Sequence, residues 1–519
     1  MTDSALAPTP ETLSVLVSTR AVLTLPDDSL ILSPATISIS QTTGKIVSIV
    51  PEALPPTSFP SPITYVNYGS RFLLPGLVDA HVHLNEPGRT EWEGFATGTR
   101  AAASGGVTTV IDMPLNAIPP TTTVHGFEVK LAASIGQCWV DVGFYGGVVP
   151  GNADQLVPLV KMGARGFKGF LIDSGVELAM RSLAGYPTTL MFHAEMIPPI
   201  TSSVGDAVQA SEPPLSPTGE LTSYGTFLDS RPPVFETCAI EEILSLAHLA
   251  PQLHLHVVHL SATECIPILK EARKSGVNIT AETCFHYLGL AAEDVEDGDT
   301  RHKCCPPIRS QINQDGLWEE LCADSHESAI KTVVSDHSPC TPELKLLPSH
   351  LQHDQVEDVQ GILLHSDSGV DVRFPDEEEE KAISGDFFAA WGGISSVGLG
   401  LPILHTTSKA HNRPLGIVDI VRLCSQATAA QAGLSHRKGG LKVGLDADVC
   451  VFDDAEEWTL ECGEMHWKNR CSPWESKKFV GRVRETWLRG QKVFEYGAAN
   501  GGFVSGGPVG EAITEERIA

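Results

Sequence analysis

The sequence predicts an α/β protein made of a (β/α)8 TIM-type barrel and a small β-sandwich domain that both chain ends form. Through the middle of the chain, short apolar and β-branched segments alternate with helix-length stretches, which is the pattern of repeated βα units. Near both ends, short strands are separated by turn residues. The 519 residues also exceed the about 250–300 at which one core stops growing, so a second domain is expected.

Eight expected strands support the barrel. Helices are expected between several of them, at 91–104, 154–162, 236–249 and 263–274. Eight parallel strands, each followed by a helix, close into a barrel whose active sites lie at the carboxyl ends of the strands. The expected strands span residues 72–84, 107–113, 140–148, 165–171, 188–194, 253–260, 277–283 and 330–336.

The two flanks of the chain predict the smaller domain. Residues 13–72 and 440–500 are expected to form the β-sandwich, and residues 73–439 the barrel domain. Strands are expected in these flanks at 13–25, 35–50, 447–452 and 483–494.

Other segments are expected to lie outside the two cores. The stretch 343–385 contains an acidic run at 376–380 and little periodicity, which favours a solvated surface insertion over a binding tail. Residues 1–12 and 501–519 are expected to be flexible tails.

The composition restricts the partners. A formal net charge of −28 argues against nucleic acid or an anionic membrane surface, because both select concentrated Lys and Arg. A small neutral molecule is therefore the expected partner. The 12 cysteines show no CxxC spacing, which favours reduced thiols in an intracellular compartment.

The chain start indicates neither secretion nor a membrane span. It has no basic region followed by an apolar one, and no continuous apolar run reaches about 18 residues. We therefore expect a cytoplasmic location. The terminal ERIA is not an SKL-type address, and a peroxisomal location is the alternative.

A pair of histidines follows the first expected barrel strand. His81 and His83 lie in the run DAHVH, and because side chains in a strand alternate between its faces, the two imidazoles point the same way. Such a pair can hold one metal ion, although a structural role is the alternative when it occurs alone.

Further candidate ligands end other expected strands. They are Lys168 on the fourth, His193 on the fifth, His259 on the sixth and Asp336 on the eighth. In a barrel these ends converge on one face, and imidazole and carboxylate suit zinc and similar ions. Taken singly, each histidine could belong to the core and Asp336 could cap a loop, but their convergence favours a metal centre.

Lys168 does not fit that donor set as an ordinary lysine. An ammonium has no lone pair and would repel metal ions. From the residue alone, a buried pair of Lys168 with a carboxylate is the favoured interpretation.

Several motifs resemble those of the cyclic amidohydrolases, and among them the allantoinases. The stretch from Pro75 to Thr123 contains DAHVHLNEPGR and TVIDMPLN, and the similarity covers most of the chain. It departs at Phe285, where the family commonly has proline, and in the insertion after SDHSPC. Similar text recurs at RGFKGFL, MFHAE, HVVHLSATE, ETCFHYL, KCCPPIRS, SDHSPCTPELK, FFAAWGGI and GGLKVGLDADVCVFD.

The resemblance implies a binuclear metal centre. Lys168 would be carboxylated on its side-chain nitrogen by CO₂ and would bridge two divalent ions, with zinc expected and cobalt, iron or manganese as alternatives. Asp336 would also be catalytic, taking a proton from the metal-bound hydroxide that attacks the ring amide and returning it to the leaving nitrogen. The implied ligands are His81, His83 and Asp336 for one ion and His193 and His259 for the other.

Two positions separate the allantoinases from other ring-opening relatives. Dihydroorotases usually have arginine where this chain has Asn85, and hydantoinases and dihydropyrimidinases typically have tyrosine where it has Asp173. The resemblance therefore implies the hydrolysis of allantoin to allantoate in purine catabolism.

Four residues are expected at the substrate. Arg89 would hydrogen-bond the ureido group or else pair with Glu91 or Glu93. The resemblance also implies substrate contacts at Asn116 and main-chain contacts at Cys305 and Trp391.

Two other functions remain as alternatives. One is a hydantoinase-like, dihydropyrimidinase-like or dihydroorotase-like enzyme with the same metal chemistry. The other is a catalytically silent relative that keeps the barrel and serves as a scaffold, which the presence of all six ligand positions argues against. In either case relatives imply a homo-oligomer, a tetramer or a dimer.

Overall fold

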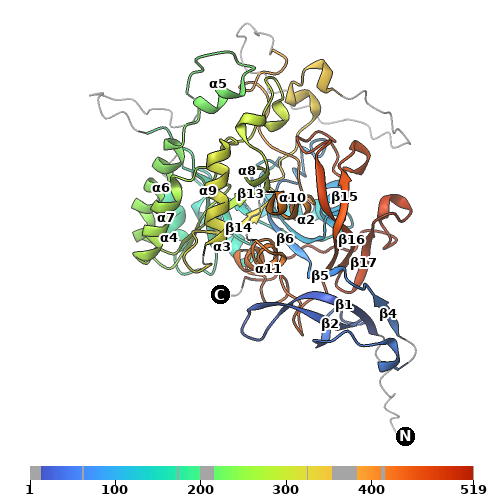
Figure 1. The fold of residues 1–519 in the computed structure, drawn as a ribbon. Coiled ribbons are helices and arrows are strands. Elements are labelled where there is room, and N and C mark those ends of the chain that lie inside the picture. Colours follow the sequence, from blue (N-terminus) through green and yellow to red (C-terminus); the bar gives the residue numbers. More distant parts are fainter. Residues whose placement is uncertain are drawn as a thin grey trace.

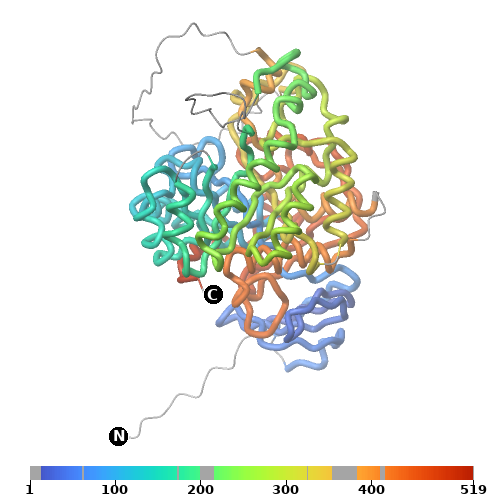
Figure 2. The backbone as a smooth tube through the Cα atoms, turned by 90° about the vertical axis from the view of Figure 1, so that its left-hand side faces the viewer, coloured from blue at the N-terminus to red at the C-terminus, as the bar shows by residue number. Residues whose placement is uncertain are grey.

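The computed structural model describes residues 13–60, 63–171, 175–198, 215–323, 325–352, 383–410 and 415–517. The tail 1–12, the acidic run 376–380 and Asp173 lie outside these ranges. The chain is drawn in Figures 1 and 2.

Parallel strands in two ladders form the middle of the chain, so the α/β prediction is confirmed. One ladder has the order β6-β7-β8 and the other β14-β13-β12-β11-β10-β9. Tyr145 alone separates β8 from β9, and an isolated parallel bridge joins Val82 in β6 to His337 after β14. The strands are β6 (Leu77–Val82), β7 (Val107–Asp112), β8 (Asp141–Phe144), β9 (Gly146–Gly147), β10 (Phe167–Phe170), β11 (Thr189–His193), β12 (His254–Val257), β13 (Ile279–Cys284) and β14 (Ile330–Val334).

Helices lie outside these strands. Every residue of β6, β7 and β8 is buried, as expected of parallel strands covered on both faces. Figure 1 shows α4, α6, α7 and α9 on the left of β13 and β14. The helices are α1 (Phe95–Ser104), α2 (Val124–Ser134), α3 (Ala153–Lys161), α4 (Gly175–Leu183), α5 (Tyr224–Asp229), α6 (Val234–Leu246), α7 (Cys265–Lys274), α8 (Phe285–Gly289), α9 (Gln311–Cys322), α10 (Gly400–Ala410), α11 (Ile417–Val421) and α12 (Ala427–Gln431).

None of the described helices has both the length and the hydrophobicity needed to cross a membrane. No disulfide joins the cysteines in the part of the chain that the structure describes.

Strands from both chain ends form one mixed sheet, in the order β17-β16-β15-β5-β1-β2-β3, with β4 paired to β1. The structure has one sheet of eight strands, whereas the sequence predicted a β-sandwich. This sheet has its own hydrophobic cluster, which includes Leu16, Ile37 and Trp487. Figure 2 shows the amino-terminal strands below the rest of the chain. The strands are β1 (Leu13–Thr24), β2 (Leu30–Ser40), β3 (Ile46–Val50), β4 (Thr64–Asn67), β5 (Phe72–Pro75), β15 (Val449–Thr459), β16 (Lys478–Leu488) and β17 (Gln491–Glu495).

Two expected single strands are hairpins. The stretch 35–50 contains part of β2 and all of β3, and 483–494 contains parts of β16 and β17. Between β16 and β17, Arg489 and Gly490 have φ of 44° and 73°, the positive values that a two-residue turn of type I′ requires. Arginine is uncommon in that conformation, so residue type hardly indicates the turn.

The carboxyl-terminal segment up to Arg517 is bound, so its prediction as a flexible tail is wrong. Ala512 forms a parallel bridge with Val142 of β8, and Ile513 is 3% exposed. Gly510 approaches Val140 so closely that a Cβ would lie 2.0 Å from the Val140 oxygen. Main-chain contacts hold this segment, and they leave no hydrophobic periodicity in the sequence.

Candidate metal centre

The predicted ligands meet at the carboxyl ends of the parallel strands. The β10–β11 register pairs Lys168 with Met191, so His193, two residues further, points to the same side of the sheet as Lys168. His81 lies near the end of β6 and His83 directly follows it, which gives them the same alternation.

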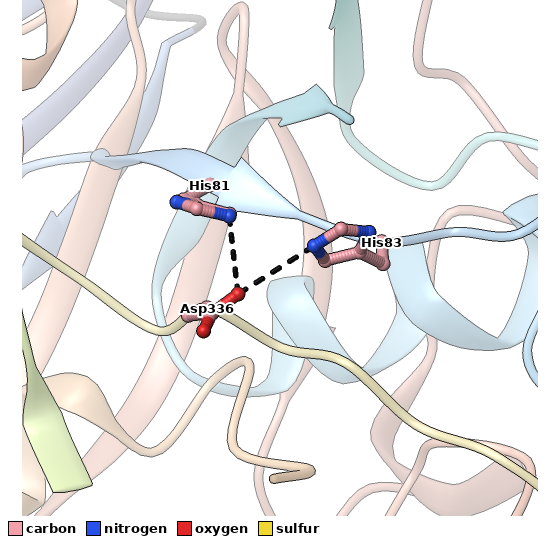
Figure 3. Close-up of side chains that lie close together, drawn as sticks. All are labelled: His81, His83 and Asp336. Carbon is pink, nitrogen blue, oxygen red and sulfur yellow. Dashed lines mark ion pairs between the residues drawn. The ribbon is translucent and has the colours of Figure 1, made fainter. Parts of the chain in front are cut away.

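His81, His83 and Asp336 form one cluster (Figure 3). The Oδ1 atom of Asp336 lies 3.1 Å from Nε2 of His81 and 3.5 Å from Nε2 of His83. Their candidate ligand atoms all lie within 4.8 Å of one another, and all three residues are buried. Two imidazole nitrogens and one carboxylate at this spacing suit a divalent metal ion.

His193 and His259 form a second cluster next to the first. Nδ1 of His193 lies 3.1 Å from Nε2 of His259, and the His259 ring centroid lies 5.5 Å from that of His81. Two imidazoles whose nitrogens face each other at this distance provide a ready pair of ligands for one ion.

Lys168 lies beside the first cluster. Its Nζ is 3.2 Å from Nε2 of His81, and the residue is 5% exposed. No carboxylate of the described residues forms an ion pair with it, so the buried lysine–carboxylate pair is not seen. Burial lowers the pKa of Lys168 below its usual value. Burial thus shifts the balance toward the neutral amine, which has the lone pair that the ammonium lacks.

A buried carboxylate, that of Glu282 in β13, contacts two of the candidate ligands. Its Oε1 lies 2.5 Å from Nδ1 of His81 and accepts from the backbone N of His259 at 3.3 Å, and its Oε2 lies 3.2 Å from Nε2 of His256. A carboxylate on the far nitrogen of a ligating imidazole fixes its tautomer and leaves the near nitrogen for a metal. Glu282 was not among the predicted residues, although the quoted motif ETCFHYL contains it.

Glu195 does the same for His193. Its Oε2 lies 3.0 Å from Nε2 of His193 and accepts from Nη1 of Arg231 at 2.8 Å. This contact leaves Nδ1 of His193 directed at His259. The residue follows His193 in the motif MFHAE, and its position two residues beyond a strand-end histidine is the available sequence indication.

Unsatisfied atoms and backbone strain also fit a metal centre. Nδ1 of His83, Nδ1 of His259 and both ring nitrogens of His286 are buried without a hydrogen-bond partner. Buried polar groups rarely lack partners without a functional reason. His259 and Asp336 also have φ of 39° and 45°, and such strain in residues other than glycine concentrates at functional sites.

The protonation states of His83 and Asp336 suit metal binding. Burial lowers the pKa of His83 to about 3, so its imidazole is neutral at pH 7. Burial opposes ionisation of Asp336, but His81, His83 and His259 together hold its pKa well below the usual value. A neutral imidazole beside an ionised carboxylate is the donor state that divalent ions require.

The expected substrate residues Arg89, Asn116 and Trp391 lie together. Nη1 of Arg89 donates to the main-chain oxygen of Asn116 at 3.1 Å, and its guanidinium lies 4.4 Å from the Trp92 ring. The Trp92 and Trp391 rings pack edge to face at 4.7 Å. No described ion pair joins Arg89 to Glu91 or Glu93.

Cys305 lies near the segment that contains Trp391. A Cβ on Gly392 would lie 3.6 Å from Sγ of Cys305, and N of Gly393 donates to O of Lys303 at 2.8 Å. The structure therefore brings the two expected main-chain contact segments side by side.

The chain matches the family model "Amidohydrolase family" over residues 72–188. It is 45% identical to the allantoinase of Saccharomyces cerevisiae over 93% of this chain and 96% of that protein. The chain belongs to the allantoinase family. It is also 37% identical to the allantoinase of Streptomyces avermitilis, over 97% of this chain and 98% of that one.

Solved structures show the same fold at lower identity. The L-hydantoinase of Arthrobacter aurescens aligns with this allantoinase-family chain at a TM-score of 0.77 and 23% identity, over 97% of this chain and 99% of that one. The dihydropyrimidinase of Brevibacillus agri aligns at 0.75 and 22%, over 98% and 100%. These likenesses concern the fold.

Proposed function

We propose that this protein hydrolyses the ring amide of allantoin to give allantoate. The observation that carries the proposal is the convergence of the predicted ligand side chains at the carboxyl ends of the parallel strands. The relatives named above support allantoin as the substrate, because two allantoinases align with nearly the whole chain.

Two divalent ions, zinc by first expectation and cobalt, iron or manganese otherwise, fit the donor set. His81, His83 and Asp336 would hold one ion, and His193 and His259 the other. When bound, such ions lower the pKa of water and polarise a carbonyl oxygen.

Lys168 would complete the centre after carboxylation. Its neutral amine would add to CO₂, forming an N–C bond and releasing a proton, and the resulting carbamate would offer two anionic oxygens. The lowered pKa of Lys168 supports this step because the amine must be unprotonated to react.

Asp336 would transfer the proton. Its carboxylate is ionised and lies between His81 and His83, so it can accept a proton from the attacking water and return it to the ring nitrogen. The nitrogen then leaves as a neutral group rather than as an anion.

The expected substrate residues around Arg89 suit a neutral ring with a ureido group. Arg89, held between Asn116 and Trp92, offers N–H donors without an ion-pair partner among the described residues. Asn85 stands where dihydroorotases usually have an arginine, and its amide donates to O of Pro339 at 3.3 Å. A clamp for a substrate carboxylate is therefore not supported there.

We also propose that the two parallel ladders close into one (β/α)8 barrel at residues 73–439, with residues 13–72 and 440–500 as the β-domain. The continuity of β8 with β9 and the bridge from Val82 to His337 support closure. The separate hydrophobic cluster of the β-domain supports the division.

Turnover of four substrates tests the activity. Purified protein is assayed with allantoin, hydantoin, dihydrouracil and dihydroorotate, and we expect turnover of allantoin far above the other three. Turnover of hydantoin with allantoin untouched would contradict the specificity. A protein that binds no divalent ion after growth with ample zinc or cobalt would support the silent scaffold instead.

A further inference from the structure

Two buried lysines converge on one loop beside the candidate metal centre. Lys303 and Lys345 are 7% and 4% exposed. Neither forms an ion pair with a carboxylate of the described residues, although burying an ammonium without polar partners is costly. Both satisfy their charge on main-chain carbonyl groups of one segment, Phe388 to Gly393.

Each lysine contacts two carbonyl groups of that segment. Nζ of Lys303 donates to O of Phe388 at 2.9 Å and also to O of Ala390. Nζ of Lys345 donates to O of Trp391 at 3.1 Å and also to O of Gly393. Hydrogen bonds from a charged donor are roughly twice as strong as neutral ones, so two side chains determine the path of this segment.

The held segment connects to the candidate centre at one end. Ile394, which follows Gly393, forms a parallel bridge with His337, the residue after Asp336. A Cβ on Gly393 would lie 2.2 Å from O of Ser338, so the two chains are in close contact. The position of the segment is therefore fixed relative to Asp336.

Lys345 also joins the two stems of the insertion. It lies in the 3-10 turn η5 (Pro342–Lys345), and N of Trp391 donates to O of Leu344 at 2.7 Å. Beyond it, N of Gly385 donates to O of Leu346 at 2.6 Å. The first part of the expected surface insertion thus contains a buried residue, Lys345, that contacts the segment of Trp391.

We propose that Lys303 and Lys345 are positioning residues that hold the Trp391 segment against Cys305 as one wall of the substrate site. They act through main-chain carbonyls and touch neither the metal ligands nor the substrate. Burial lowers the pKa of Lys303 to about 8, so its ammonium is still largely charged at neutral pH. The proposal rests on the proposed function for the identity of the substrate.

Kinetics of single variants test this role. Lys303→Met and Lys345→Met are compared with wild type and with Lys442→Met, a control whose lysine lies in the loop before β15 and bonds Asp28. We expect KM for allantoin to rise roughly 10- to 100-fold in the first two, because small displacements of a substrate wall are costly. We expect kcat to stay within about threefold, with unchanged metal content. The KM of Lys345→Arg should lie close to the wild-type value, and the KM of the control should equal it.

Either of two results would overturn the proposal. One is a wild-type KM in both methionine variants, which would make the lysines purely structural ties. The other is loss of metal or of kcat with KM unchanged, which would assign them to the metal centre. If Lys345→Met does not fold, Lys303→Met against wild type still makes the comparison, with Lys345→Arg as the variant that keeps the charge.

A second readout does not depend on the substrate. Acrylamide quenching is measured for each protein and for its Trp391→Phe counterpart, so that the difference reports Trp391 alone. We expect stronger quenching of Trp391 in Lys345→Met than in wild type, and equal quenching would overturn the proposal. A protein inactive on allantoin but with this change in quenching would refute the proposed function while retaining the positioning role.

Discussion

Two buried lysines at different places along the parallel strands have opposite surroundings. Lys438 is fully buried, and its Nζ lies 2.7 Å from Asp141, 2.8 Å from Asp448 and 3.0 Å from Asp446. Asp141 begins β8, so this cluster lies at the amino ends of the strands. Lys168, in β10, has an imidazole as its polar neighbour instead.

The difference separates a lysine whose charge is held by ion pairs from one whose charge burial disfavours. Burial lowers the pKa of Lys438, but the three carboxylates outweigh burial and raise it above the usual value. Burial prevails at Lys168 and lowers its pKa. The Lys438 ammonium joins Asp141 of the parallel strands to Asp448, next to β15 of the mixed sheet, whereas the Lys168 amine has no such ion pair among the described residues.

The largest expected effect comes from a variant that breaks the ion-pair cluster of Lys438. Lys438→Met should lower the free energy of unfolding by about 3–5 kcal/mol, because it leaves Asp141 and Asp448 buried without their ammonium. Chemical denaturation at pH 7 measures the loss. Lys442→Met is the matched control and should change stability by less than about 1 kcal/mol, since its ion pair with Asp28 is exposed. Equal losses of stability in the two variants would contradict a structural role for the Lys438 cluster.

The next effect sharpens the reactive side of the comparison. Glu282→Gln keeps the shape of the side chain but removes the charge that fixes His81, so metal affinity should fall about 10- to 100-fold. Competition with a chelator measures that affinity. An unchanged affinity with a large loss of stability would place Glu282 with the structural charges instead.

A smaller effect is expected on the pH dependence of stability. Burial opposes ionisation of Asp446, but Lys438, Lys45 and Arg437 hold its folded pKa below the usual value. Its stabilisation is therefore complete above the unfolded pKa of about 3.9 and is lost as pH falls through the folded pKa. Asp446→Asn should cost about 1–2 kcal/mol at pH 7 and progressively less below about pH 4. Denaturation at both pH values checks this, and a pH-independent cost would contradict it.

The sequence predicted which candidate ligands come together better than it predicted the residues that contact them. His81, His193 and Asp336 could be found because strand ends are visible as apolar runs, and parallel strand ends converge. Glu282 lies 201 residues from His81, and Lys438 lies 297 from Asp141, so neither pair has a local spacing that predicts contact. The turn at Arg489 and the bound tail to Arg517 were missed because main-chain geometry, rather than residue type, defines them.

The account depends most on Lys168 as a bridging ligand. The direct measurement is metal content and allantoate formation by wild type and Lys168→Ala, with and without an added short carboxylic acid. We expect two divalent ions per wild-type subunit, loss of turnover in Lys168→Ala with folding retained, and partial recovery when the acid supplies the missing carboxylate. A Lys168→Ala protein that keeps wild-type metal content and turnover without added acid would contradict the account.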